Sequence, residues 1–204
     1  MRFTFTNQIV SFRVFLRPSE LPAAEAAFVD CRNIAITLRT LMKHSLKKNR
    51  KRVTSAILPT DADWGDYKSD LDQNHAYTVF AKRTNEEMQP FFRRNPLGLT
   101  DDLRWMPDVP FRYYILGFRD AVMANQFDLH SGADAASCFL GLVLEKLERQ
   151  PRLVVPVMPE LLTAVEYVAR NQRLFDADEA IYGNFLEKLS QIQTLYAPYA
   201  ALNC

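Results

Sequence analysis

The sequence lacks the long apolar runs of membrane and secreted proteins. Its longest such run, residues 139–144, is far shorter than the roughly 20 residues that a helix needs to cross a bilayer. A secretory signal needs an apolar stretch of about 7–15 residues behind a positive start, whereas residues 1–6 alternate apolar and polar side chains. We therefore expect a cytoplasmic protein that does not associate with membranes.

Cysteine is scarce, and no residue pattern marks a metal or cofactor site. Cys31, Cys138 and Cys204 are odd in number and far apart, so they predict neither a disulfide framework nor a metal knuckle and favour a reducing compartment. There is no Gly-rich phosphate loop, no nucleophile elbow and no His-Glu-x-x-His zinc motif. His75 and His130 have no neighbours at ligand spacing, and we interpret them as surface or loop residues. We expect no metal, no cofactor and no catalytic residues.

Positive charge is concentrated in the first part of the chain. Residues 1–58 carry eleven Lys and Arg against three acidic residues, whereas residues 59–204 carry fourteen against twenty-one, so the net charge of +1 hides two opposite halves. Six of the early cations lie within ten residues and form what we call the basic block: Lys43, Lys47, Lys48, Arg50, Lys51 and Arg52. Such a block is typical of a docking surface for a polyanion, or of a segment that the acidic half of the same molecule neutralises.

The first half of the chain favours a small sheet covered by one long helix. Apolar and polar residues alternate over 2–16 with a change of phase at 6–8, which predicts a strand region with a hairpin or a bulge. The segment 53–58, closed by Pro59, predicts a short second strand, and the alternation within 75–83 predicts a third. Between the first two, apolar residues spaced three and four apart from Leu21 to Met42 form a heptad seam, which predicts the long helix. A strand, a crossover helix and a second strand would make a right-handed βαβ unit.

The Asp-rich tract 61–72 resembles a calcium loop only in part. Its Gly65 stands one place before the position that such a loop requires, and Asp72 stands where the bidentate Glu is needed. We therefore interpret the tract as a polar loop that faces the basic block.

The stretch 89–110 contains four prolines and predicts a mostly looped junction with one short helix at 100–104. It would separate an α+β subdomain, 1–88, from a helical subdomain, 111–204, or lie inside one continuous domain.

The helical half carries a faint internal repeat. Asp134 and Asp176 are each followed, at equal spacing, by a glycine and then by Leu-Glu-Lys-Leu. Two αα-hairpins, each with a helix capped by one of these aspartates, would account for the pattern. The whole chain thus predicts an α+β fold that is predominantly helical, with a small N-terminal sheet on a long helix and a C-terminal helical half.

The basic block is the first candidate for binding. Phosphate neutralisation needs several cations close together, and Lys43, Lys47 and Arg50 share one face if their helix continues. Arg93 and Arg94 are second candidates, because they lie in a segment that mixes arginines and aromatics: Phe91, Phe92, Arg93, Arg94, Arg104, Trp105, Arg112, Tyr113 and Tyr114. Bases could stack on such aromatics, but ordinary core packing is the favoured interpretation of the rings.

We predict a non-enzymatic, nucleic-acid-associated component of a larger complex, in which the basic block contacts RNA or DNA phosphates. A helical adaptor that binds another protein, or a second copy of itself, through its helical faces is the alternative.

A more remote alternative is a metal-independent ribonuclease. The spacing of Arg39 and His44 resembles the Arg-x4-His element of helical ribonucleases of the HEPN type, in which an Arg and a His from two subunits act on an RNA phosphodiester. The expected strands near the N-terminus depart from that all-helical family, and Thr40 only loosely matches the polar residue that usually follows the arginine.

Overall fold

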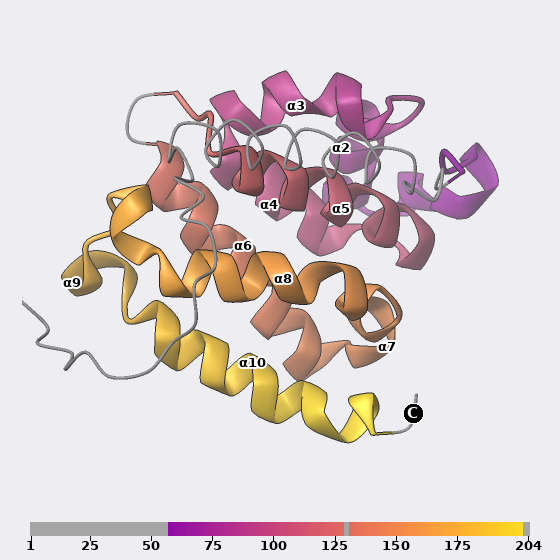
Figure 1. The fold of residues 1–204 in the computed structure, drawn as a ribbon. Coiled ribbons are helices and arrows are strands. Elements are labelled where there is room, and N and C mark those ends of the chain that lie inside the picture. The colour runs from indigo at the N-terminus through magenta and orange to yellow at the C-terminus, as the bar shows by residue number, and fades with distance from the viewer. Residues whose placement is uncertain (1–56, 129–130, 202–204) are drawn as a thin grey trace, which may run out of the picture. The chain divides into compact units, whose positions relative to one another are not determined.

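A computed structural model describes residues 57–128 and 131–201, which are mainly helical (Figure 1). They belong to one compact unit, Ser55–Cys204. The basic block, the heptad seam, Arg39 and His44, and the predicted strand at 2–16 lie outside the described residues. The α-helices are α2 (Leu71–Phe80), α3 (Asn85–Arg94), α4 (Pro96–Trp105), α5 (Asp108–Ala124), α6 (Ser131–Arg149), α7 (Pro151–Val154), α8 (Met158–Arg170), α9 (Glu179–Tyr182) and α10 (Phe185–Ala200). Short 3-10 helices are η1 (Asp61–Trp64), η2 (Tyr67–Ser69), η3 (Val155–Val157) and η4 (Gln172–Phe175).

The predicted α+β class is wrong, whereas the predominantly helical character is confirmed. The described residues contain no strand, and the predicted strand at 75–83 is mostly helix α2. Ala76 and Phe80, four positions apart, are the fully buried residues of this helix. The alternation at Tyr77, Val79 and Ala81 covers too few positions to separate a period of two from the helical period.

The stretch 89–110 is also helical, contrary to the prediction of a loop. Pro96 occupies the first position of α4 and Pro107 is the N-cap of α5, which are positions where a missing N–H costs no helical hydrogen bond. The side chain of Asn95 caps α4, accepting from the backbone N–H of Gly98 at 3.1 Å. Three of the four prolines therefore lie at or near helix starts, and the chain turns sharply between α3, α4 and α5.

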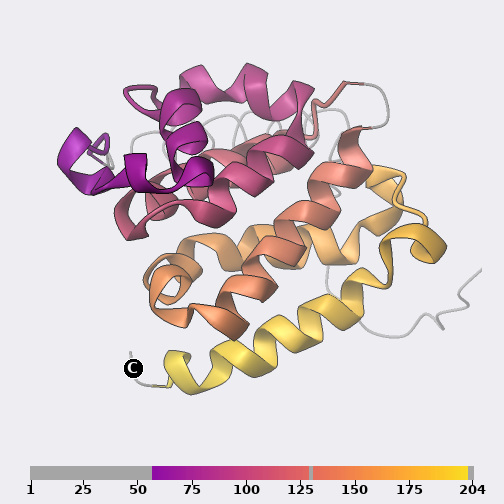
Figure 2. The same cartoon turned by 180° about the vertical axis from the view of Figure 1, so that it is seen from behind.

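Helices α5 and α6 form the centre of the unit. Helix α5 packs against α3, α4, α6 and α8, while α6 packs against α4, α5, α8 and α10. In both Figure 1 and Figure 2, α2 to α5 lie on one side of the unit and α8 and α10 on the other. Spacings of three and four positions direct one broad face of α5 into the core. Its buried residues include Phe111, Tyr114, Ile115, Phe118, Ala121 and Val122.

The side chain of Tyr114 fixes the turn between α2 and α3. Its hydroxyl oxygen lies 2.6 Å from the carbonyl oxygen of Phe80 and 2.9 Å from that of Arg83. Burial raises the pKa of Tyr114, which keeps the hydroxyl protonated as a donor. The hydroxyl thus contacts carbonyl groups on both sides of the turn, that of Phe80 at the end of α2 and that of Arg83 shortly before α3.

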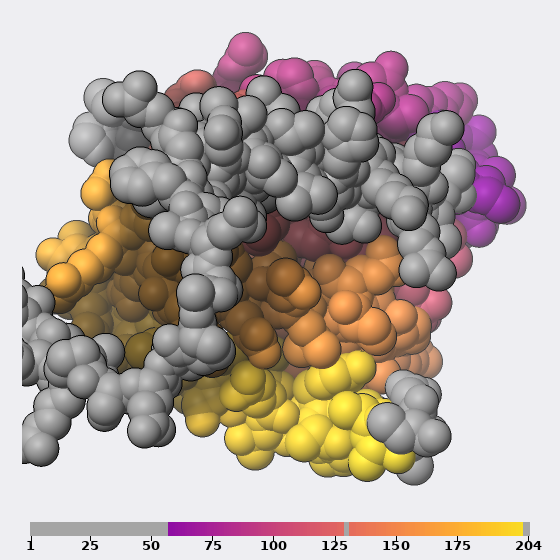
Figure 3. All heavy atoms as spheres, in the orientation of Figure 1, coloured from indigo at the N-terminus to yellow at the C-terminus, as the bar shows by residue number. Residues whose placement is uncertain are grey.

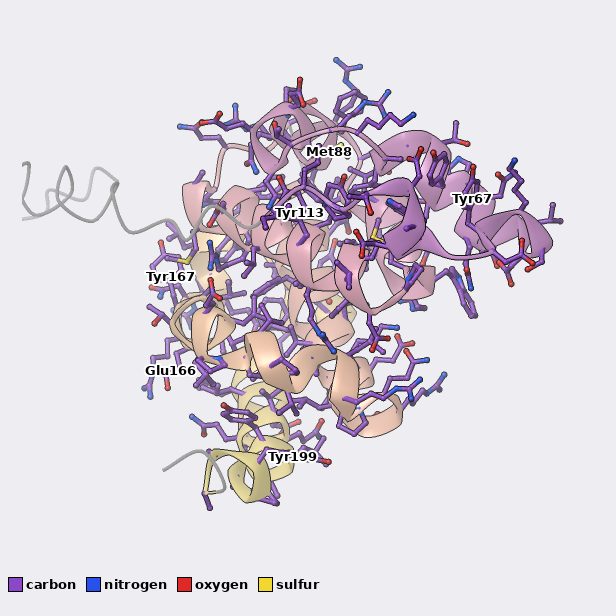
Figure 4. All side chains as sticks on the ribbon, turned by 90° about the vertical axis from the view of Figure 1, so that its right-hand side faces the viewer. Tyr67, Met88, Tyr113, Glu166, Tyr167 and Tyr199 are labelled. Atoms are coloured by element: carbon purple, nitrogen blue, oxygen red, sulfur yellow. The ribbon has the colours of Figure 1, made fainter. Side chains whose placement is uncertain are left out.

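The Asp-rich tract is anchored to the core rather than being a plain loop. It forms η1 and η2 and then caps α2, because the Asp70 carboxylate accepts from the backbone N–H groups of residues 72 and 73 at 2.9 Å. Trp64 is buried and meets the ring of Tyr77 edge-on, with centroids 5.4 Å apart. Tyr77 in turn stacks on Tyr67, which Figure 4 labels near the end of this segment, at 3.7 Å.

The structure does not support the internal repeat. Gly141 lies inside the continuous helix α6, whereas its counterpart Gly183 has a φ of 73° and separates α9 from α10. Asp134 lies in the first turn of α6, and Asp178 rather than Asp176 caps α9. The shared letters reflect common helix-forming residues and not a repeated structure.

Candidate functional site

The structure places one pair of the predicted binding residues, Arg93 and Arg94, at the end of α3. Arg94 is exposed, and neither guanidinium contacts a carboxylate in the described part of the chain. The side chain of Arg93 is half-buried, and its buried Nε atom has no hydrogen-bond partner there. The backbone carbonyl of Arg93 accepts from the N–H of Asp128 at 3.4 Å, which fixes this helix end against the loop before α6. Both side chains therefore retain hydrogen-bonding capacity.

An exposed aromatic ring on α3, Phe91, lies near arginines. The guanidinium carbon of Arg83 is 5.4 Å from the centroid of the Phe91 ring, a cation–π contact. Arg94 follows Phe91 by three positions and so lies on a neighbouring part of the helix surface. The core interpretation of the aromatics is confirmed for Phe92 and Tyr114, which are fully buried, but not for Phe91 and Trp105, which are exposed. Arg83, Phe91 and Arg94 together provide cations around an exposed ring, which is the combination that the predicted stacking site requires.

His75 has a partner that the sequence does not indicate. Its Nδ1 atom lies 2.6 Å from Oδ1 of Asp102 on α4, which is buried at 6% exposure, while the side chain of His75 is 69% exposed. Burial raises the pKa of Asp102, and the hydrogen bond from His75 opposes that rise. An imidazole oriented by a carboxylate can transfer protons through its free nitrogen. Among the described residues, however, no nucleophile is hydrogen-bonded to His75, so we interpret the pair as structural.

A hollow in the described unit lies where α8, η4, α9 and α10 meet. It has a volume of about 560 Å³, and in Figure 3 the orange surface of α8 and α9 adjoins the yellow surface of α10. Its lining consists of Ala169, Arg170, Asn171, Gln172, Arg173, Leu174, Ala177, Asp178, Glu179, Asn184 and Leu186. We call it the α8–α10 hollow. No sequence motif indicated it, although its residues lie close together in the chain.

The side chain of Gln172 braces the floor of the α8–α10 hollow. Its Nε2 atom donates to the carbonyl oxygens of Ala177, at 3.1 Å, and Gly183, at 2.8 Å. Its Oε1 atom accepts from the backbone N–H of Phe185 at 3.0 Å. One amide thus ties η4 to both ends of α9 and to the start of α10, so the walls are held before any ligand arrives.

A smaller groove of about 280 Å³ lies on the side of α5 that faces η3 and α8. Tyr113, which Figure 4 labels on α5, lines it together with Ile57, Val109, Arg112, Leu116, Pro156, Val157 and Glu160. Arg112 is occupied, because it donates to the carbonyl oxygens of Arg152 and Leu153 and pairs with Asp108. The groove is mainly apolar, and the guanidinium of Arg112 is already engaged by these partners.

No known protein family, curated protein or solved structure matches this chain. In the described ranges, no His, Cys, Asp and Glu side chains gather in a group of three that could hold a metal ion. The same ranges contain no helix that is both long and apolar enough to span a membrane. A functional assignment therefore rests on the residues of the chain itself.

Proposed function

We propose that the protein is a non-enzymatic, nucleic-acid-associated component of a larger complex, in which the basic block 43–52 binds the phosphate backbone of RNA or DNA. The observation that carries the proposal is the segregation of charge along the chain. Residues 1–58 have eight more basic than acidic side chains, and the following part of the chain has seven more acidic than basic ones. A dense cationic segment that is followed in the sequence by an acidic part favours binding of a polyanion through that segment alone.

The surface of α3 is a second candidate contact within this proposal. Arg94 has no carboxylate partner in the described ranges, and Phe91 is exposed beneath the guanidinium of Arg83. A base could stack on such a ring while the arginines meet phosphates. Backbone contacts of this kind would position the nucleic acid without reading its sequence.

The test is a fluorescence-anisotropy titration of labelled single- and double-stranded RNA and DNA with the full chain. With six or more phosphate contacts, the affinity should fall by about a thousandfold between 50 and 200 mM salt. A variant with alanine at positions 47, 48, 50, 51 and 52 should lose this binding, and Arg94→Ala should weaken it modestly. An Arg149→Ala/Arg152→Ala variant, which removes two other arginines without a carboxylate partner in the described ranges, is the control.

Binding that is insensitive to salt, or unchanged in the five-alanine variant, would contradict the proposal. Circular dichroism of each variant must show the helical content of the parent chain. The same samples report on the ribonuclease alternative, because cleavage of the labelled RNA that is lost in His44→Ala would establish it.

A further inference from the structure

The α8–α10 hollow carries two arginines without acidic partners. Arg170 ends α8 and Arg173 lies in η4, and neither side chain makes a hydrogen bond or an ion pair within the described ranges. Elsewhere in the same unit, Arg104 and Arg119 each contact two carboxylates. Since acidic residues outnumber basic ones in this part of the chain, partners for Arg170 and Arg173 are not scarce. Their guanidiniums are open to an external anion.

The carboxylates of the hollow are engaged in local hydrogen bonds. Asp178 caps α9, and its Oδ1 atom accepts from the backbone N–H of Ala180 at 2.9 Å. Oε1 of Glu179 accepts from Nδ2 of Asn184 at 3.0 Å. Oδ1 of Asn184 in turn caps α10, because it accepts from the backbone N–H groups of residues 186 and 187. Both carboxylates thus hold the walls of the hollow through local donors, whereas the guanidiniums of Arg170 and Arg173 have no such partner in the described ranges.

Two leucines give the hollow apolar walls. Leu174 of η4 is 54% exposed and Leu186 of α10 is 53% exposed. Covering such side chains with apolar groups of a ligand would be favourable. None of the described residues that line the hollow is aromatic, so they offer a nucleobase no ring to stack on. Its volume of about 560 Å³ falls within the roughly 300–1,000 Å³ of typical ligand sites.

We infer that the α8–α10 hollow binds a short acidic segment of a partner protein, with a carboxylate on Arg170 and Arg173 and an adjacent aliphatic side chain between Leu174 and Leu186. An inorganic anion would use the arginines but not the leucines, and a nucleotide would lack stacking. An acidic and aliphatic peptide matches both features. The site is independent of the basic block, so it gives the helical unit a protein-binding role of its own.

The test is an NMR titration of the ¹⁵N-labelled full chain with a short peptide that alternates aspartate and leucine. The amide resonances of residues 169–186 should shift, and binding should weaken about tenfold or more in Arg170→Glu/Arg173→Glu. Leu186→Ser should weaken it as well. The matched controls are Arg149→Glu/Arg152→Glu, whose arginines also lack carboxylate partners in the described ranges, and Leu97→Ser, because Leu97 is 53% exposed like Leu186. Both controls should bind the peptide as the parent chain does.

Three outcomes would overturn the inference. They are an unchanged affinity in Arg170→Glu/Arg173→Glu, equal binding of a peptide that alternates lysine and leucine, and the same resonance shifts with inorganic phosphate alone. The milder variant Arg173→Gln covers the case in which the double reversal disturbs folding, and it should also weaken binding. The five-alanine variant of the basic block should keep its peptide affinity, so failure of the nucleic-acid proposal and failure of this one are distinguishable.

Discussion

The Nδ1 atom of His75 on α2 lies 2.6 Å from Oδ1 of Asp102 on α4. The pair joins the two helices, although the two residues are 27 positions apart in the sequence. In the described ranges, His75 is the hydrogen-bond partner of the Asp102 side chain. Burial raises the pKa of Asp102 above its ordinary value of 3.8 despite this bond. The exposed histidine thus serves to compensate a buried carboxyl group.

Replacing His75 should lower the free energy of unfolding, and the size of the loss should depend on pH. Because the folded-state pKa of Asp102 is raised, the stability that this group contributes is present below pH 3.8 and is lost as the pH rises through the raised value. His75→Ala removes the group that opposes the rise. We expect a loss of about 1–3 kcal/mol in the free energy of unfolding at neutral pH, shrinking in acid.

Urea denaturation of the parent chain and of His75→Ala, from pH 4 to pH 7, measures this effect. Asn74→Ala is the matched control, because Asn74 is an exposed neighbour on α2 whose side chain makes no hydrogen bond in the described ranges. Equal losses at both ends of the pH range would argue against a role for the Asp102 charge.

Two helical glycines should respond to alanine in opposite directions. At Gly117 of α5, a Cβ atom would overlap the side-chain amide of Asn85 on α3. That amide is held in place, because its Nδ2 atom donates to the carbonyl oxygen of Tyr113 at 2.9 Å. Gly117→Ala should therefore lower the free energy of unfolding by about 1–3 kcal/mol in spite of the better helix propensity of alanine.

Gly141 of α6 is the internal comparison. A Cβ atom there would meet nothing within 4 Å, so Gly141→Ala should raise the free energy of unfolding by about 0.5–1 kcal/mol. Urea denaturation of both variants measures the contrast. Adding Asn85→Ala to Gly117→Ala should relieve part of the loss, and an unchanged loss in the double variant would show that the overlap is not its cause.

The buried face of the last long helix could be predicted from its strong helical periodicity. Phe185, Leu189, Ile192 and Tyr196 follow one face at spacings of four, three and four, and all four are buried in α10. The same spacing in the sequence continues back to Ile181, but Ile181 is exposed, because Gly183 has a positive φ and separates α9 from α10. Periodicity identifies a long buried face but does not identify the backbone conformation at one glycine.

The candidate site could be predicted much less well. Arg170 and Arg173 are visible as a pair three positions apart, but only the fold shows that no described carboxylate reaches them. The partnership of His75 with Asp102 depends on the packing of α2 against α4, which local sequence does not encode. Whether the basic block binds phosphates stays a prediction, because it lies outside the described residues.

Lys146 of α6 is a buried lysine without a carboxylate partner in the described ranges. Its Nζ atom donates to the carbonyl oxygen of Arg104 and to Oε1 of Gln150, both at 2.6 Å, and it lies 5.4 Å from the centroid of the Phe111 ring. The residue is only 3% exposed, and this burial lowers the pKa of Lys146 below its ordinary value of 10.5. The folded state therefore holds the proton less tightly than the unfolded state does.

The lowered pKa makes the stability of the folded protein depend on pH. With a lowered pKa in the folded state, the contribution of Lys146 to stability is fully present above pH 10.5 and is lost as the pH falls through the lowered value. Lys146→Met keeps an unbranched chain of similar length but cannot titrate. The free energy of unfolding of the parent chain should therefore rise relative to that of Lys146→Met as the pH is raised from 7 toward 10.5. Urea denaturation across this range tests it, with Lys68→Met as the exposed control, and parallel curves for the parent chain and Lys146→Met would show that burial does not disfavour the charged amine.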